Sequence, residues 1–367
     1  MNTSEKESEK KLFSLLEKII GKVGVPDSNA VNEAQKKLDN LTKPRGSLGR
    51  LEELAKQIAG ISGRIITGFD NKIIFTIAGD HGVTEEKISA YPKEVTPQMV
   101  FNFLNGKAAI NVLARHTGAR VMVVDMGVCF DFEDHPFLIS KKIGYGTRNM
   151  AQEPAMTRKE AIQSILGTYN LVPENKKGSG TCTDIIGTGD MGIGNTTASS
   201  AIAAVICKTD AGEVTGLGTG LDERGLRNKI NVIKKAIELN RPDPEDAIDV
   251  LSKVGGFEIG GIAGLIIGAA AKRIPVVIDG FISGAGALIA QKLCPNSKYF
   301  MIASHQSVEK GHAVILSELG LKPLFNLDLR LGEGTGAALG IGFAEASLKI
   351  MNEMATFSEA NVSEKTE

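Results

Sequence analysis

The first sixty residues have the pattern of amphipathic helices. Apolar residues recur at intervals of three and four from Leu12 to Val23 and again from Leu48 to Ile61, which places them along one face of a helix in each segment. No strand-like run interrupts this region. The pattern therefore predicts that the chain begins with helices alone.

The pattern changes at residue 72, where short β-branched runs begin to alternate with helical segments. The runs are "KIIFTIAGDHG", "RVMVVDMG", "TDIIGTGD", "IPVVIDGF" and "KYFMIASHQ". Continuous apolar runs of this length are typical of strands that are covered on both faces, and their alternation with helices predicts a parallel sheet. The expected fold class is α/β, with a mostly parallel sheet flanked by helices.

Helix boundaries are marked at two places in the second half of the chain. In "DPEDAIDVLSKVGG", Asp243 is expected as the N-cap, Pro244 in the first turn and Gly255 just past the end. The last helix is expected to run from Thr335 to about Met354, before the polar segment "SEANVSEKTE".

Both ends of the chain are thus expected to be helical, which suggests that they form one unit. We expect a small helical domain from residues 1–65 plus 335–367, and a large α/β domain from residues 66–334. In an open parallel sheet, ligands bind beyond the carboxyl ends of the strands, where loops lead into helix N-termini. The large domain is therefore expected to hold the active site.

Composition narrows the classes of function. The formal net charge is −1 and aromatic residues make up 5% of the chain, which argues against nucleic-acid binding and against attraction to an anionic membrane. The four cysteines form no C-x-x-C motif and indicate reduced thiols in a cytoplasmic protein. The N-terminus lacks the apolar stretch of a signal peptide. The most apolar segment, "GGIAGLIIGAAA", is well short of the roughly 20 residues that a membrane span needs.

Glycine is the one unusual component, at 42 of 367 residues against roughly 7% in an average chain. The glycines cluster after the apolar runs, in "AGDHGV", "GTGDMGIGNTT", "GLGTGLD", "DGFISGAGAL", "SHQSVEKGH" and "LGEGTGAAL". Glycine lets the backbone turn tightly or approach a ligand closely. So many such motifs at one sheet edge indicate a large polar ligand.

The segment "GTGDMG", residues 187–192, matches the G-x-G-x-x-G pattern of dinucleotide-binding proteins. The acid required about 20 residues later falls on Asp210, in the loop-like "CKTDAGE", so the match is weak. Asn195 and Thr196 then begin a helix, where backbone N–H groups and hydroxyls can hold a phosphate. Capping of that helix by either residue explains the pair equally well.

The motif "GLGTGLDERGLRNK" ends in Lys229, a candidate phosphate contact, although a helical lysine is more often solvated. The chain contains no G-x-x-x-x-G-K-[ST] motif, which argues against a Walker-type ATPase or kinase. A site for a magnesium pyrophosphate would have a pair of adjacent acids after a strand. The strand segments "VVIDGF" and "VMVVDMG" carry one acid each, so they give little support for such a site. The histidines show no ligand spacing, so Asp80 and His81 in "AGDHGV" indicate a turn or a polar pocket wall, and no metal site is expected.

Glu333 lies between two glycines in "LRLGEGTGAALG", just before the last helix. Glutamate is too long to serve well as an N-cap. Desolvation at this position raises the pKa of the carboxyl group toward neutrality, as a general base requires, and a nearby carboxylate such as Asp190 pushes one of the two further up. The alternative is a surface acid paired with Arg330.

Taken in order, the motifs resemble the nicotinate-nucleotide:dimethylbenzimidazole phosphoribosyltransferase family. They are "KPRGSLGRLEELA", "AGDHGV" with "SAYPKEVTPQMV", "GDMGIGNTT", "GTGLDERGL", "EIGGIAG", "DGFISGAGAL", "SHQSVEKGH" and "LRLGEGTGAAL". The resemblance extends from about residue 35 to residue 355 and leaves only the two tails outside it.

This resemblance implies a Rossmann-like fold, a homodimer and one reaction. The phosphoribosyl group of nicotinate mononucleotide is transferred to a benzimidazole, which gives α-ribazole phosphate and nicotinate for the lower ligand of cobalamin. Glu333 falls on the family's general base, which accepts the ring N–H proton as the other nitrogen attacks C1′ of the ribose. Nicotinate leaves from a pyridinium, so the resemblance implies neither a metal nor another cofactor.

The resemblance also carries over to other residues. Asp190 is the second catalytic candidate. Family members often have the longer glutamate at this position, so the shorter Asp190 leaves two alternatives open: assistance to Glu333 directly, or only through water. The implied phosphate and ribose contacts are Gly192, Gly194, Asn195, Thr196, Gly218, Thr219, Gly220 and Lys229. Asp279 and Ser307 are implied as further nucleotide contacts, Asp80 as a polar wall, and Ser89, Tyr91, Gln98 and Leu331 as contacts of the aromatic base.

Two other functions stay open at this point. One is an NAD-dependent oxidoreductase that uses "GTGDMG", and the other is a non-catalytic nucleotide-binding regulator, which has no need of a desolvated Glu333. The aromatic base is a substituted benzimidazole, a purine or a phenol.

Overall fold

The computed structural model describes residues 3–172, 183–218 and 220–363. Its strands are β1 (Lys72–Gly79), β2 (Arg120–Gly127), β3 (Leu138–Ser140), β4 (Ile185–Met191), β5 (Val276–Ile278) and β6 (Met301–Ala303). Its α-helices are α1 (Thr3–Ile20), α2 (Ser28–Asp39), α3 (Arg50–Ser62), α4 (Val95–Leu104), α5 (Ala109–Thr117), α6 (Arg158–Thr168), α7 (Asn195–Ile206), α8 (Ala211–Val214), α9 (Glu223–Asn240), α10 (Ala247–Val254), α11 (Phe257–Ala271), α12 (Phe281–Leu293), α13 (Lys310–Leu319) and α14 (Thr335–Glu353). Two 3₁₀ helices, η1 (Gly82–Glu86) and η2 (Pro295–Phe300), complete the set.

The strands form one parallel sheet in the order β3-β2-β1-β4-β5-β6. This is the strand order of the Rossmann fold, in which the direction of sheet building reverses between β1 and β4. The predicted α/β class and its parallel sheet are confirmed. Each of the five predicted apolar runs contains a strand. The sixth strand, β3, was not predicted; it has only three residues and none of them is buried.

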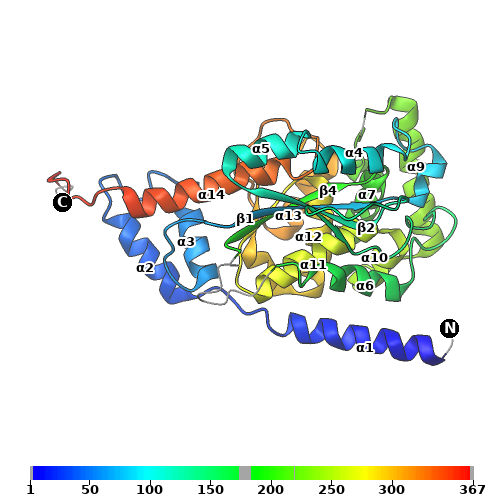
Figure 1. Ribbon diagram of the computed structural model, residues 1–367, viewed down its shortest axis with the longest axis horizontal. Coiled ribbons are helices and arrows are strands. Elements are labelled where there is room, and N and C mark those ends of the chain that lie inside the picture. The colour runs from blue at the N-terminus through cyan, green and yellow to red at the C-terminus, as the bar shows by residue number, and fades with distance from the viewer. Residues whose placement is uncertain (1–2, 173–182, 219, 364–367) are drawn as a thin grey trace.

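Helices cover both faces of the sheet (Figure 1). α4, α5 and α14 contact one face, while α11 and α12 contact the other and α6 packs behind α11. Residues of β1 alternate between the two layers: Ile74 belongs to the core on the α14 side, and Phe75 belongs to the core on the α11 side. The strands are therefore buried on both faces, as their continuous apolar runs predict.

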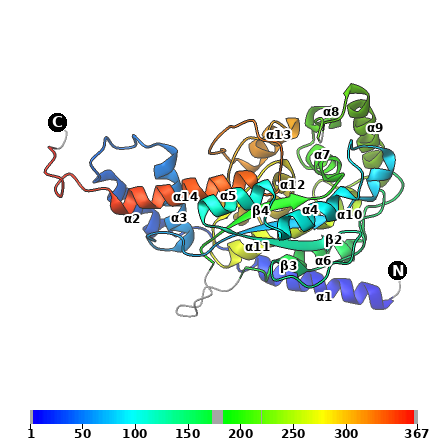
Figure 2. The same ribbon diagram turned by 45° about the horizontal axis from the view of Figure 1, so that its top comes forward.

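The helices at the chain ends do not form one unit. α2 and α3 pack on each other and on α14, away from the sheet (Figures 1 and 2). α1 instead lies against α6 and α11, and its residues Leu16 and Ile19 join the core on the α11 side. The division into residues 1–65 plus 335–367 and residues 66–334 stays a proposal for α2, α3 and α14. For α1 the division also stays a proposal, and its contacts with α6 and α11 favour placing it with the large α/β domain.

The last helix begins at Thr335 as predicted and ends at Glu353. The predicted start of α10 is wrong, because its N-cap is Asp246 and the side chain of Asp243 accepts a hydrogen bond from the N–H of Glu245 instead. Gly255 ends α10 as expected. Among the described residues, no helix combines the length and the apolar character that a membrane span requires.

Candidate active site

The glycine motifs meet at the carboxyl ends of β1 and β4, the point where the strand order reverses. A Cβ at Gly192, just after β4, would overlap the carbonyl oxygen of Gly79 at the end of β1. Glycine is therefore required here for the two strand ends to approach each other. In sheets of this order, ligands bind in the crevice that opens at this point.

Glu333 is held above the strands by an unusual backbone turn. Three consecutive residues have left-handed φ values: 81° at Gly332, 63° at Glu333 and 101° at Gly334. For glutamate this conformation costs on the order of 1–3 kcal/mol and persists only where the surroundings impose it. The hydroxyl of Thr76 on β1 donates to the carbonyl oxygen of Glu333 over 2.8 Å, and Gly189 on β4 leaves room for the same peptide group.

The carboxyl group of Glu333 is withdrawn from solvent. The residue is 5% exposed, and one carboxylate oxygen accepts a hydrogen bond from the N–H of Ile110 at the start of α5, over 3.3 Å. Burial raises the pKa of the carboxyl group, and the bond from Ile110 opposes that shift only in part. Within the described ranges no ion pair joins Glu333 to Arg330, and Glu333 is buried, so it is not a surface acid paired with that arginine.

Asp279, directly after β5, anchors the turn that carries Glu333. Its two carboxylate oxygens accept hydrogen bonds from the N–H groups of Gly334, Gly336 and Ala337, at 2.7–3.1 Å, and so bind the N-terminus of α14. Burial raises the pKa of Asp279 to about 7, against the effect of these three bonds. Both oxygens are thus used within the protein, and a contact between Asp279 and a nucleotide stays a prediction.

Asp190, near the end of β4, lies beside the same turn. The amide of Asn195 donates to its Oδ2 over 2.9 Å, while Oδ1 is buried without a partner among the described residues. Burial is the main cause that raises the pKa of this carboxyl group well above its ordinary value, followed by repulsion from Asp279. Repulsion from Glu333 is a smaller cause, so the expected mutual effect of the two acids is present but minor.

The N-terminus of α7 forms an anion-binding corner next to Asp190. The N-cap is Gly194 with a φ of 98°, and no side chain caps the helix. Asn195 bonds to Asp190 instead, and the hydroxyl of Thr196 accepts a hydrogen bond from Nζ of Lys229 over 2.7 Å. The capping explanation for Asn195 and Thr196 is therefore wrong. The N–H groups of Asn195 and Thr197 donate to the carbonyl oxygens of Gly192 and Gly194, whereas that of Thr196 has no partner among the described residues and remains available to an anion.

Lys229 is the charged group of this corner. It is fully buried, contrary to the solvated lysine that helix statistics favour, and burial lowers its pKa to about 8. A Cβ at Gly218 would lie 3.1 Å from both Nζ of Lys229 and Oγ1 of Thr196, so the second glycine motif closes over these two groups. Gly220 has a φ of 102°, and a Cβ at this position would meet no atom within 4 Å, so Gly220 does not close over the two groups. Thr219 lies outside the described residues.

Ser307 follows β6 on the far side of the crevice. Its N–H donates to Nδ1 of His312 over 2.9 Å, and its hydroxyl accepts a hydrogen bond from the N–H of Glu309. Sequence reasoning singled out Ser307 but missed His312, although both belong to "SHQSVEKGH". It also missed Thr76 and Ile110, which contact Glu333 and stand in no recognisable motif.

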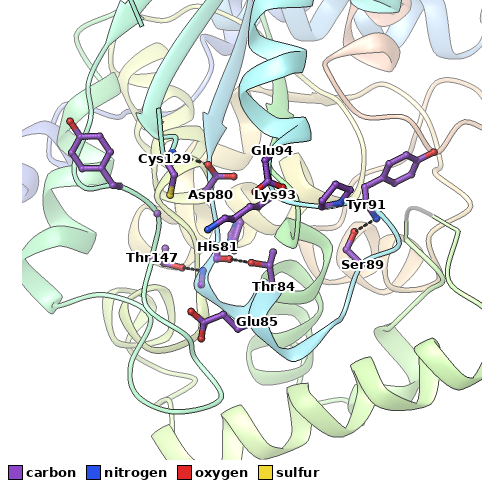
Figure 3. A pocket seen from close by; sticks show the side chains of 14 residues that line it. Asp80, His81, Thr84, Glu85, Ser89, Tyr91, Lys93, Glu94, Cys129 and Thr147 are labelled. Atoms are coloured by element: carbon purple, nitrogen blue, oxygen red, sulfur yellow. Dashed lines mark hydrogen bonds between the residues drawn. The ribbon is translucent and has the colours of Figure 1, made fainter. Parts of the chain in front are cut away.

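A cavity of about 470 Å³ opens at the ends of β1 and β2 (Figure 3). Asp80 and His81 lie in its middle, with Cys129 and Thr147 on one side and Ser89 and Tyr91 on the other. His81 is buried and forms an ion pair of 2.8 Å with Glu258 on α11. The predicted pocket wall at Asp80 is thus supported.

Only part of the predicted base-binding set lies in this cavity. Ser89 and Tyr91 line it, whereas Gln98, Leu331 and Glu333 do not. The side chain of Leu331 is 57% exposed and that of Tyr91 is 53% exposed. The predicted contacts of these residues with an aromatic base stay predictions.

The dinucleotide motif has the wrong geometry. Gly187 and Gly189 lie inside β4, where a fingerprint motif would have the turn that follows the strand. Asp210, the acid that would bind a ribose, caps the short helix α8 at the surface and pairs with Lys234. Among the residues that the structure describes, no cluster of histidine, cysteine or acidic side chains fits a metal ion.

These features define the class of the protein as a Rossmann-like α/β protein whose crevice combines a desolvated carboxyl group with a buried lysine at a helix N-terminus. The profile of the phosphoribosyltransferase family matches residues 23–362. The chain belongs to this family.

Relatives cover almost the whole chain. It is 56% identical over 350 residues to the nicotinate-nucleotide–dimethylbenzimidazole phosphoribosyltransferase of Geobacter sp. (strain M21), covering 95% of this chain and 99% of the relative. It is 54% identical over 354 residues to the protein of the same name from Chloroflexus aurantiacus (strain ATCC 29366), covering 96% and 100%. The crystal structure of the protein of that name from Thermus thermophilus superimposes with a TM-score of 0.85 at 40% identity, covering 92% of this chain and 100% of that one.

Proposed function

We propose that this protein transfers the phosphoribosyl group of nicotinate mononucleotide to 5,6-dimethylbenzimidazole or a related base. The products are α-ribazole 5′-phosphate and nicotinate, and the reaction serves the synthesis of the lower ligand of cobalamin. The names and the high identity of the relatives support this assignment over nearly the full length of the chain. The misfit of "GTGDMG" to a dinucleotide site argues against the oxidoreductase alternative.

The buried Glu333 carries the proposal. A benzimidazole attacks through one ring nitrogen and must lose the proton on the other, which requires a base with a pKa close to that of the medium. Burial raises the pKa of Glu333 in this direction. The regulator alternative gives no reason for a buried acid held in a strained backbone conformation.

The anion corner is suited to the nucleotide phosphate. Lys229 supplies a positive charge and Thr196 a hydroxyl, and these two groups converge at Gly218. The N–H of Thr196, at the start of α7, adds a backbone donor. Binding the phosphate here holds the sugar beside Glu333, which converts a two-substrate reaction into one between neighbouring groups.

Bond breaking follows from the chemistry of the nucleotide. The glycosidic nitrogen belongs to a pyridinium ring, so nicotinate departs with the bonding electron pair and needs no prior protonation. The incoming nitrogen attacks C1′ from the opposite face, which turns the β linkage into an α linkage. The azole proton goes to Glu333, and the charges of the reaction balance.

The direct test is the release of nicotinate from nicotinate mononucleotide and 5,6-dimethylbenzimidazole. Wild-type protein that releases none would refute the proposed function. In Glu333→Gln we expect turnover to fall by roughly 10²-fold or more while binding of the nucleotide is retained, because only proton acceptance is lost. Glu345→Gln, on the helix that follows and paired with Lys72, is the matched control and should keep its turnover. Normal turnover in Glu333→Gln would assign the base to another residue.

The further parts of the assignment are a homodimer and a cytoplasmic location. Phe101, Phe130 and Phe132 form a cluster with ring centroids 4.9–5.5 Å apart, and Phe101 and Phe130 are more than 40% exposed, which supports a contact with a second copy. Light scattering during gel filtration tests the dimer. The cytoplasmic location rests on cysteine usage alone.

A further inference from the structure

His305 lies at the carboxyl edge of the sheet, two residues after the end of β6. Its ring fits between two glycines: a Cβ at Gly280 would lie 3.6 Å from Nε2, and a Cβ at Gly336 would collide with the Nδ1 edge. The same Cβ at Gly280 would lie 3.9 Å from Cβ of Ser307. His305 therefore stands between the ends of β5 and β6, next to the crevice.

The hydrogen bonds around Ser304 identify which ring nitrogen of His305 carries the proton. The hydroxyl of Ser304 donates to the carbonyl oxygen of Asp279 over 3.0 Å, and Nδ1 of His305 lies 3.1 Å from the same hydroxyl oxygen. A carbonyl oxygen can only accept, and a hydroxyl has a single hydrogen to donate. Nδ1 must then be the donor to Ser304, which leaves Nε2 of the neutral ring with an unshared electron pair.

The ring is also fixed in place and neutral. Phe325 stacks on it with a centroid distance of 5.9 Å and an interplanar angle of 19°, and His312 lies edge-on at 6.0 Å. Burial lowers the pKa of His305 to about 4, so the neutral tautomer persists at physiological pH. Nε2 has no hydrogen-bond partner among the described residues, and His305 as a whole is 2% exposed.

A lone-pair nitrogen at this place selects a hydrogen-bond donor. The phosphate dianion and the nicotinate carboxylate of the substrate offer only acceptor oxygens, which the lone pair repels. The remaining donors of nicotinate mononucleotide are the two ribose hydroxyls, since the N–H of the aromatic base is assigned to Glu333. We propose that Nε2 of His305 accepts a hydrogen bond from a ribose hydroxyl and makes the enzyme select ribonucleotides. This inference rests on the proposed function and adds its sugar specificity.

Two variants separate this role from the packing role of His305. In His305→Asn the amide stays near the position of Nδ1, so it can donate to Ser304, but it cannot reach the position of Nε2. In His305→Gln the longer side chain brings its carbonyl oxygen to the position of Nε2 and gives up the bond to Ser304. Thermal unfolding of both variants shows whether either substitution disturbs the fold.

The kinetic test compares nicotinate mononucleotide with its 2′-deoxy and 3′-deoxy analogues. We expect His305→Asn to lose about tenfold in kcat/KM with the ribonucleotide, the size of one lost hydrogen bond, and almost nothing with the analogue that lacks the partner hydroxyl. His305→Gln should recover part of this loss. If the preference for the ribonucleotide over both analogues is the same in His305→Asn as in the wild type, the proposal is wrong.

A second readout does not depend on catalysis. The chain has five histidines, and ¹⁵N NMR of the imidazoles resolves protonated from unprotonated ring nitrogens. The signal that is missing from the spectrum of His305→Asn belongs to His305. Its Nε2 should be unprotonated, and the Nε2 signal should shift when nicotinate mononucleotide binds. The exposed His116 should not respond. An Nε2 that carries the proton, or one that is unaffected by saturating nucleotide, overturns the proposal. If the wild-type protein binds the nucleotide but releases no nicotinate, the proposed function is refuted while the hydrogen bond from the ribose to His305 is not.

Discussion

Gly189 offers a way to move the proposed base without altering any reacting group. It lies in β4 under the turn of Glu333, and a Cβ at this position would lie 2.5 Å from the carbonyl carbon of Glu333 and 2.7 Å from the nitrogen of Gly334. Ordinary van der Waals contact begins at 3.4 Å, so in Gly189→Ala the turn must retreat by about 1 Å. The neighbouring atoms are backbone and cannot rotate away.

We expect Gly189→Ala to lower kcat by about 100-fold, because a displacement of about 1 Å has that effect on a positioned catalytic group. Overpacking should also cost about 1–3 kcal/mol in the free energy of unfolding. Nicotinate release at saturating substrates gives kcat, and urea unfolding gives the stability.

Gly187→Ala is the matched control, two residues earlier on the same face of β4. Its Cβ would meet only side chains, Cβ of Ala337 and Cγ1 of Ile74, both at 3.1 Å, which can yield by a few tenths of an ångström. This variant should be mildly destabilised and keep most of its kcat. Equal kcat values in the two variants would show that the turn on β4 does not position the base.

Two further predictions concern the titratable groups. Lys229 has its pKa lowered to about 8, and its positive charge is lost as the pH rises through that value, so KM for nicotinate mononucleotide should rise steadily above about pH 8. Lys229→Met should have a high KM that no longer changes with pH in this range, and a rise identical to that of the wild type would point to another group. Burial raises the pKa of Asp190 well above its ordinary value and so favours the protonated, uncharged carboxyl group, which an amide resembles; Asp190→Asn should therefore keep kcat within a few-fold of the wild type and preserve the bond from Asn195. If Asp190→Asn instead loses as much turnover as Glu333→Gln, Asp190 acts in its ionised form.

The sequence was most informative where many residues contribute to one pattern. Strands buried on both faces need mostly apolar residues, and this requirement marked β1, β2, β4, β5 and β6, including the short edge strand β6, which is fully buried. β3 escaped because a short edge strand with partly exposed residues needs no such run. The stripe on α1 indicated a helix, but it carried no information about which surface the helix would cover.

The ends of helices depend on single hydrogen bonds and were harder to predict. Asp243 and Asp246 are equally good caps by residue type. The structure selects Asp246, whose carboxylate accepts from the N–H groups of Ile248 and Asp249, while Asp243 closes a turn of its own. The choice depends on the path of the preceding chain, which a local pattern does not contain.

In the candidate site, too, the sequence patterns could be predicted and the single contacts between distant residues could not. Glycine motifs and the acid between them were visible because the strained turn at Glu333 tolerates few residue types. Thr76 and Ile110 were not visible, since they act through a hydroxyl and a backbone N–H brought near by the fold. The orientation of His305 depends on Ser304 and on the carbonyl group of Asp279, a combination that only three-dimensional coordinates reveal.

The position of Glu333 immediately before the final helix has a consequence for synthesis of the protein on the ribosome. The anion corner is complete once Lys229 has been made, but the turn of Glu333 depends on bonds from Asp279 to the first residues of α14. Until that helix leaves the exit tunnel and docks on the sheet, a nascent chain has no ordered group to take the proton. The proposed base is therefore set in place only after α14 has been made, and a chain that terminates before this helix lacks it.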